Sequence, residues 1–168
     1  MRRFTPPGTP VMRRILAATA LALAASPAWA DALVVAADAD LEFGRFAASP
    51  VLASRVAIGT DGLRTTDNGA LLSGAAPQPA RFTVRGDAGR GFTATVMAVL
   101  ADTPGVSLGN LTATCGPGSA FGAGQLSGCR LDGAGQATIL VGATLVVDAG
   151  QGTTSLNAPS AITVRVSN

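Results

Sequence analysis

ILVGATLVV occupies residues 139–147 and carries the strongest structural signal in this chain. Its odd-numbered positions form an unbroken apolar row: Ile139, Val141, Ala143, Leu145 and Val147. A period of two places such a row on one face of an extended strand, with that face buried. Gly142 interrupts the run, and a glycine inside a strand favours a β-bulge or a close backbone contact.

The same alternation recurs in other runs on both sides of this stretch, namely residues 41–43, 82–84, 92–100 and 162–166. Turn signals separate the runs, at Asp61-Gly62, Asn68-Gly69, Gly86-Asp87, Gly116-Pro117-Gly118, Asp132-Gly133 and Ala149-Gly150. No window after residue 30 shows a convincing helical period with caps. The sequence therefore predicts an all-β chain with seven or more short strands, folded as a single antiparallel immunoglobulin-like β-sandwich.

The N-terminal region has the build of a secretory signal peptide. Basic residues after Met12 precede an apolar run at residues 15–25, and the stretch closes with the small residues of Ala28-Trp29-Ala30. This predicts a signal helix in residues 1–30, cleavage between Ala30 and Asp31, and a single domain at residues 31–168. A second Met-Arg-Arg at Met12 favours translation starting there, the alternative being a long n-region. The product is expected in the periplasm, at the cell surface or outside the cell, with no transmembrane span.

Removal of residues 1–30 changes the charge of the protein. The whole chain has a net charge of +2, but four arginines leave with the leader while all ten acidic residues stay. Eight arginines against ten acidic residues give the remainder a net charge of −2. A basic surface for nucleic acid is therefore not predicted.

Cys115 and Cys129 are the only cysteines. In an exported chain an even pair indicates a disulfide, and this one would close a short, glycine-rich loop. A redox-active pair is disfavoured, because there is no Cys-x-x-Cys and no nearby Lys or His to lower a thiol pKa.

Missing residue types exclude much chemistry. The chain has no histidine and no lysine, which excludes Ser-His-Asp triads, histidine-ligated zinc and Schiff-base chemistry. After loss of the leader no Trp or Tyr remains, so the usual stacking platforms for sugars or single-stranded nucleic acid are absent. The chain is expected not to be an enzyme and to need no cofactor.

Asp38, Asp40 and Glu42 are the densest carboxylate group. On one strand they would project from the same face. One interpretation is a calcium site, because calcium prefers hard oxygen ligands. The other is a solvated strand face or a charged arm that protects a sheet edge. The spacing is not that of an EF-hand loop, so the second interpretation is favoured and no metal site is assigned.

Residues 86–91, GDAGRG, superficially suggest a phosphate-binding loop. Such a loop needs a helix N-terminus after the glycines, but a strand-like segment follows here, so a hairpin turn is predicted. Arg81 and Arg85 share one strand face, where they either bind an anion or keep that face exposed to solvent.

Several segments in order resemble a known family: residues 41–44 (LEFG), 59–64 (GTDGLR), 80–86 (ARFTVRG), 141–147 (VGATLVV) and 162–166 (ITVRV). Together they are similar to the secreted bacterial domain of unknown function 4402, whose layout resembles spore-coat-U-like and pilin-like domains. The resemblance implies an immunoglobulin-like sandwich in the envelope or outside the cell, and supplies no catalytic residues.

The leading functional hypothesis is a non-enzymatic structural or interaction domain, such as a pilus- or coat-like subunit, that pairs a sheet edge with another copy or an envelope partner. Residues 32–37 and 161–167 are the candidate donor segments, unless both are ordinary strands of a monomer. The alternative is a periplasmic small-ligand or calcium-binding module using the carboxylates above.

Overall fold

The structure, a computed structural model, describes residues 32–74, 76–99, 104–151 and 161–168. The predicted signal helix, its cleavage site Ala30–Asp31 and the alternative start at Met12 lie outside these residues. The described part contains strands and no helix, which confirms the all-β prediction. In chain order the strands are β1 (Val34–Ala39), β2 (Phe46–Ala48), β3 (Ser54–Ile58), β4 (Arg64–Asp67), β5 (Gly69–Leu71), β6 (Ala80–Arg85), β7 (Gly91–Val99), β8 (Val106–Thr114), β9 (Ala120–Gly122), β10 (Gln125–Arg130), β11 (Gln136–Val147) and β12 (Ala161–Ser167).

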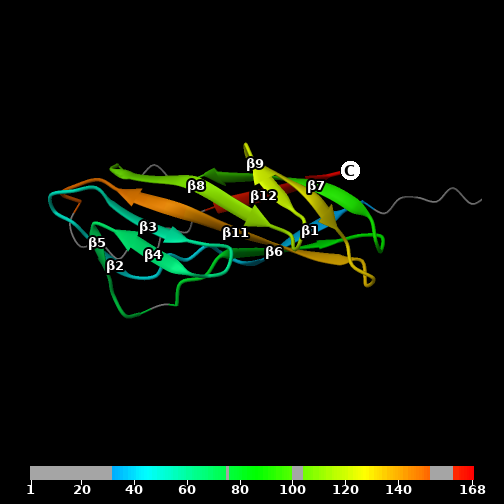
Figure 1. Cartoon of the computed structure of the whole chain (residues 1–168), viewed down its shortest axis with the longest axis horizontal. Coiled ribbons are helices and arrows are strands. Elements are labelled where there is room, and N and C mark those ends of the chain that lie inside the picture. Colours follow the sequence, from blue (N-terminus) through cyan, green and yellow to red (C-terminus); the bar gives the residue numbers. More distant parts are fainter. Residues whose placement is uncertain (1–31, 75, 100–103, 152–160) are drawn as a thin grey trace, which may run out of the picture.

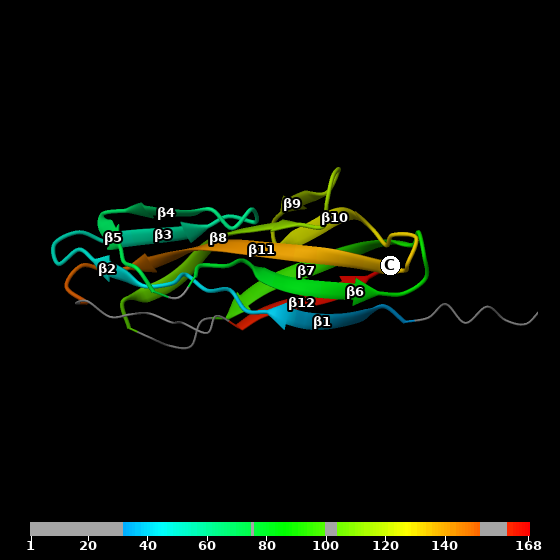
Figure 2. The same cartoon turned by 90° about the horizontal axis from the view of Figure 1, so that it is seen from below.

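Two antiparallel sheets form the body of the molecule (Figure 1). The six-stranded sheet has the order β1-β6-β11-β3-β4, with β8 also paired to β11. The four-stranded sheet has the order β12-β7-β10-β9. A small sheet of β2 and β5 lies at one end of the molecule (Figures 1 and 2).

β11 organises the larger sheet. It is 12 residues long, longer than the short strands that the sequence predicts. Its first half pairs with β6 and its second half with β3, while β8 pairs with residues 140–147. A strand has two edges. β8 pairs along one edge of β11, while β6 and then β3 pair along the opposite edge. From Leu140 to Val147, β11 is thus paired with a strand on each edge, apart from the irregularity described next.

Gly142 lies where the neighbour changes from β6 to β3. A Cβ atom at this position would collide with the carbonyl oxygen of Ile58. The register against β8 also shifts between Gly142 and Thr144. The predicted close backbone contact is therefore confirmed and allows β3 to approach the sheet closely, whereas the extra residue of the register shift lies in β8.

The core fills the space between the two larger sheets. The apolar row of β11 is 0–2% exposed at all five positions, and the alternating residues Phe82, Val84, Phe92 and Val96 are buried as well. Side chains from β6 and β11 of one sheet join those from β7 and β10 of the other in a single buried cluster. The predicted sandwich layout follows from this shared core.

The loop at residues 86–91 departs from the prediction. It follows β6 of the larger sheet and leads into β7 of the smaller one, so it crosses between sheets and is not a hairpin turn. Its backbone is held by the β10–β11 loop: Gly86 N donates to Gly135 O at 3.0 Å and Gly89 N to Leu131 O at 3.1 Å. These N–H groups are occupied within the fold, and β7 follows in place of a phosphate-binding helix.

Candidate functional site

The three candidate carboxylates do not lie on one strand. Asp38 is in β1, where the register against β6 shifts between Ala37 and Ala39, and its carboxylate accepts a 2.6 Å hydrogen bond from Thr83 Oγ1. β1 ends before Asp40, and Glu42 forms a separate backbone bridge with Gln78. The predicted row of three on one strand is therefore wrong, because the bulge and the end of β1 interrupt it. Within the described ranges, no three acidic or cysteine side chains form a group that could hold a metal ion.

Arg81 and Arg85 lie exposed on β6, as the alternation predicts. Neither arginine lines the depression described below. The two arginines thus give a polar outer face to the strand.

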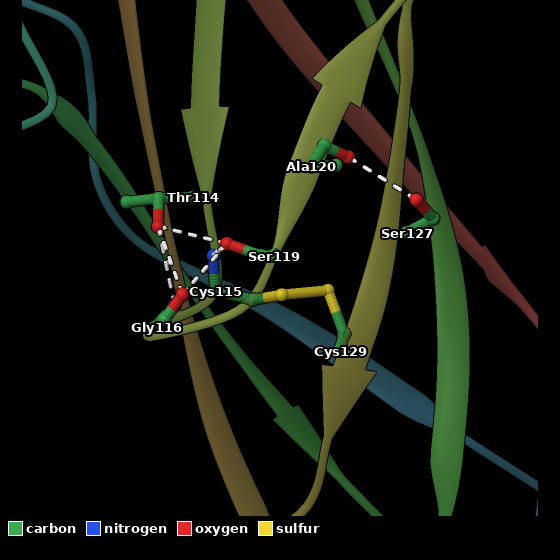
Figure 3. The surroundings of a disulfide bond; sticks show 7 residues. All are labelled: Thr114, Cys115, Gly116, Ser119, Ala120, Ser127 and Cys129. Carbon is green, nitrogen blue, oxygen red and sulfur yellow. Dashed lines mark hydrogen bonds between the residues drawn. A yellow bond between two sulfur atoms is a disulfide. The ribbon is translucent and has the colours of Figure 1, made fainter.

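Cys115 and Cys129 form the predicted disulfide (Figure 3). Cys115 directly follows β8 of the six-stranded sheet and Cys129 lies in β10 of the four-stranded sheet, so the bond joins the two layers. Their Cα atoms are 5.6 Å apart. Ser119 Oγ accepts from Cys115 N at 3.3 Å and donates to Gly116 O at 2.7 Å, which fixes the turn after Cys115.

A shallow depression of about 310 Å³ lies on the outer face of the six-stranded sheet. Its floor is made of small side chains on β3, β4 and β11, including Ala57, Thr65 and Thr144. Asn110 lines one side, from a bulge in β8 where its φ is +46°. Asp61 lines it too, but its carboxylate accepts a hydrogen bond from Leu63 N at 2.9 Å. An adjoining depression shares part of this lining and includes the ion pair of Arg55 and Asp67, whose Nη1 and Oδ2 atoms are 3.3 Å apart.

The alternation of apolar residues did not predict this depression. The dipeptide Gly109-Asn110 inside an otherwise regular strand is a signal for the bulge, since Asn tolerates a positive φ.

Sheet edges are the other candidate. Among the described residues, five strands lie at the edges of the two large sheets, and four of them have features that oppose pairing. β1 contains the register shift beside Asp38, and β8 contains the bulge at Asn110. β4 is four residues long with a charged residue at each end, and β9 has three residues. Bulges, short strands and charges are the usual means by which proteins prevent edge-to-edge association.

β12 is longer than β4 and β9, and its pairing contains no bulge. Its seven residues pair with β7 in one continuous register, from Ala161 opposite Val99 to Ser167 opposite Thr93. It contains no proline or glycine, and Arg165 is its only charged residue. Within the described ranges, no second strand pairs with it. Its outer edge, the β12 edge, is therefore a straight row of backbone donors and acceptors.

The core is incompletely covered beneath this edge. Ile162, Val164 and Val166 pack against the core but are only half-buried. β1 lies next to β12 on the same flank of the sandwich (Figure 2). Some Cα atoms of the two strands are within 8 Å of each other. Val35 of β1 is half-buried in the same way. This flank, where the first and last strands meet, joins an unprotected edge to partly exposed apolar side chains.

Both candidate donor segments are strands of the same sandwich. Residues 34–39 pair with β6, and residues 161–167 pair with β7. Neither is therefore a detached arm in this structure.

Comparison with known proteins gives one match. Residues 33–166 match the protein-family model described as "Domain of unknown function (DUF4402)". No curated protein and no solved structure matches the chain. In the residues that the structure describes, no helix is long and apolar enough to cross a membrane.

Proposed function

The chain belongs to the DUF4402 family, and on that premise we propose that it is an exported, non-enzymatic structural domain that binds another protein chain through the β12 edge. A subunit of a surface appendage or coat is the kind of protein that works in this way. The observation that carries the proposal is the continuous seven-residue register of β12, whose outer edge has no bulge, proline or cluster of charges. An extended partner strand gains main-chain hydrogen bonds along such an edge.

Export is supported by the leader-like sequence at residues 12–30 and is compatible with the Cys115–Cys129 disulfide, since such bonds persist in oxidising compartments. A non-enzymatic role is supported by the absence of histidine and lysine from the sequence. These observations favour binding over catalysis.

The test uses the full chain, expressed in an exporting bacterial host. N-terminal sequencing of the exported product is expected to begin at Asp31. Native mass measurement of the extract is expected to show the protein in complexes heavier than a single chain. Val164→Lys places a charge at the half-buried row of β12 and is expected to abolish these complexes.

Thr66→Lys is the matched control, because it adds the same charge to β4, an edge that is already protected. It is expected to leave the complexes intact. A wild-type product that is a single chain both in the extract and after purification would refute the proposal, as would complexes that survive Val164→Lys and dissolve with Thr66→Lys.

The calcium-binding alternative has no support from the geometry, because Asp38, Asp40 and Glu42 do not form a group suited to a metal. A ligand that binds only the folded state must raise the melting temperature. We expect no change in melting temperature at millimolar calcium, and an increase that Asp40→Asn removes would revive the alternative.

A further inference from the structure

The β12 edge is suited to a partner with a matching strand, and this chain itself supplies one. Homo-oligomers are most often two-fold symmetric dimers, in which the same surface on both copies forms the interface. Two antiparallel strands related by a two-fold axis satisfy that condition. We propose that the partner of β12 is the β12 of a second copy, paired antiparallel with the two-fold axis at Val164. This inference rests on the proposed function and names its partner.

The position of the axis follows from the side chains of β12. With Val164 opposite itself, all seven residues of β12 are paired. The half-buried row then meets its counterpart, since Ile162 lies opposite Val166. Apolar residues directly opposite one another are favourable cross-strand pairs.

Charge favours the same register. With the axis at Val164, Arg165 lies opposite Thr163 on the outer face. Moving the axis to Arg165 would place the two arginines directly opposite each other, which is destabilising. Moving it to Thr163 places Arg165 opposite Ala161 and leaves Val166 and Ser167 of each copy beyond the paired segment. The register centred at Val164 is therefore the longest one that also keeps the arginines apart.

Such a dimer would join two four-stranded sheets into one continuous sheet, in the order β9-β10-β7-β12 followed by the same strands of the second copy in reverse. It would also cover Ile162, Val164 and Val166, the apolar side chains that the monomer leaves half-exposed. Both main-chain pairing and apolar burial then favour association.

The register can be tested with added cysteines, because both native cysteines are held in the disulfide and the described residues contain no free thiol. Thr163 and Arg165 are exposed, so changing them leaves the core intact. In the proposed dimer, purified Thr163→Cys and Arg165→Cys proteins are expected to form a mixed disulfide dimer when combined under mild oxidation. A mixture of Thr163→Cys and Ser167→Cys is the matched control, since those positions are not opposite each other.

Two measurements on the purified exported protein complete the test. Sedimentation equilibrium is expected to show a concentration-dependent dimer whose association Val164→Lys weakens by about tenfold or more. The first cysteine mixture is expected to cross-link several times faster than the control mixture.

A purified protein that stays monomeric at all concentrations would overturn the dimer. If the extract still contained complexes sensitive to Val164→Lys, only the identity of the partner would be wrong and the proposed function would stand. Equal cross-linking of the two mixtures in a genuine dimer would overturn the register.

Discussion

β11 and β12 share a local pattern but differ in their surroundings. Both contain Ile-x-Val, at Ile139 and Val141 in β11 and at Ile162 and Val164 in β12. The two residues of β11 are fully buried, whereas those of β12 are half-buried. β11 pairs with β6 or β3 on one edge and, from Leu140 onward, with β8 on the other, whereas β7 is the one strand that pairs with β12 in the described residues. Ile139 is fully buried although β8 pairs only from Leu140 onward, so its place inside the shared core counts as well as the number of paired strands. The same alternation thus makes a core strand in one place and a candidate interface in the other.

The largest effect is expected from a matched pair of truncations, Ile139→Ala in β11 and Ile162→Ala in β12. Ile139 is 0% exposed, so its truncation leaves a cavity and should lower the free energy of unfolding by about 4 kcal/mol. Ile162 loses less burial, and its truncation should cost about 1 kcal/mol. Urea denaturation at low protein concentration measures both values. Equal losses would contradict the assignment of β12 as an incompletely covered strand.

Replacing both cysteines by alanine should have the next largest effect, because the disulfide joins the sheet that contains β11 to the sheet that contains β12. Its loop is closed over a sequence separation of 14, and loss of such a cross-link costs about 3 kcal/mol. Thermal unfolding of the variant measures the loss, and reduced wild-type protein is the control. An unchanged melting temperature would show that the bond does not hold the layers together.

Gly142→Ala tests the close packing around β11. The added Cβ meets the carbonyl oxygen of Ile58, so we expect a loss of about 2 kcal/mol in the free energy of unfolding. Gly109→Ala on β8, which pairs with β11 in the same sheet, is the matched control, because nothing lies within 4 Å of its added Cβ. It should leave stability unchanged or raise it by about 0.5 kcal/mol. Equal behaviour of the two variants would contradict the close approach of β3 to β11.

The smallest effect is expected in β1, the strand that lies beside β12. Asp38→Ala removes the 2.6 Å hydrogen bond from Thr83 at an exposed position in β1, which should cost about 0.5 kcal/mol. A double-mutant cycle with Thr83→Val isolates this value from other effects of the substitution. A coupling well above 1 kcal/mol would show that the bulge in β1 contributes more to the fold than an edge feature should.

Much of the fold was predictable from local patterns. The buried rows of β6, β7 and β11, the close backbone contact at Gly142 and the disulfide all follow from residues close in sequence or from the number of cysteines. Two expectations failed for a shared reason. The loop at residues 86–91 crosses between sheets, and the row of Asp38, Asp40 and Glu42 is interrupted, because each depends on which remote strands lie alongside.

The sequence by itself determined the alternation of side chains, since the period of two is a property of the extended backbone. It also determined the chemistry that is absent, because a chain without histidine and lysine cannot supply imidazole or amine groups. Only the tertiary structure decided that β11 lies inside a sheet and β12 at an edge. The neighbours of β11, namely β3, β6 and β8, come from distant parts of the chain. Whether a strand is enclosed or open therefore depends on long-range pairing, and its own residues do not encode it.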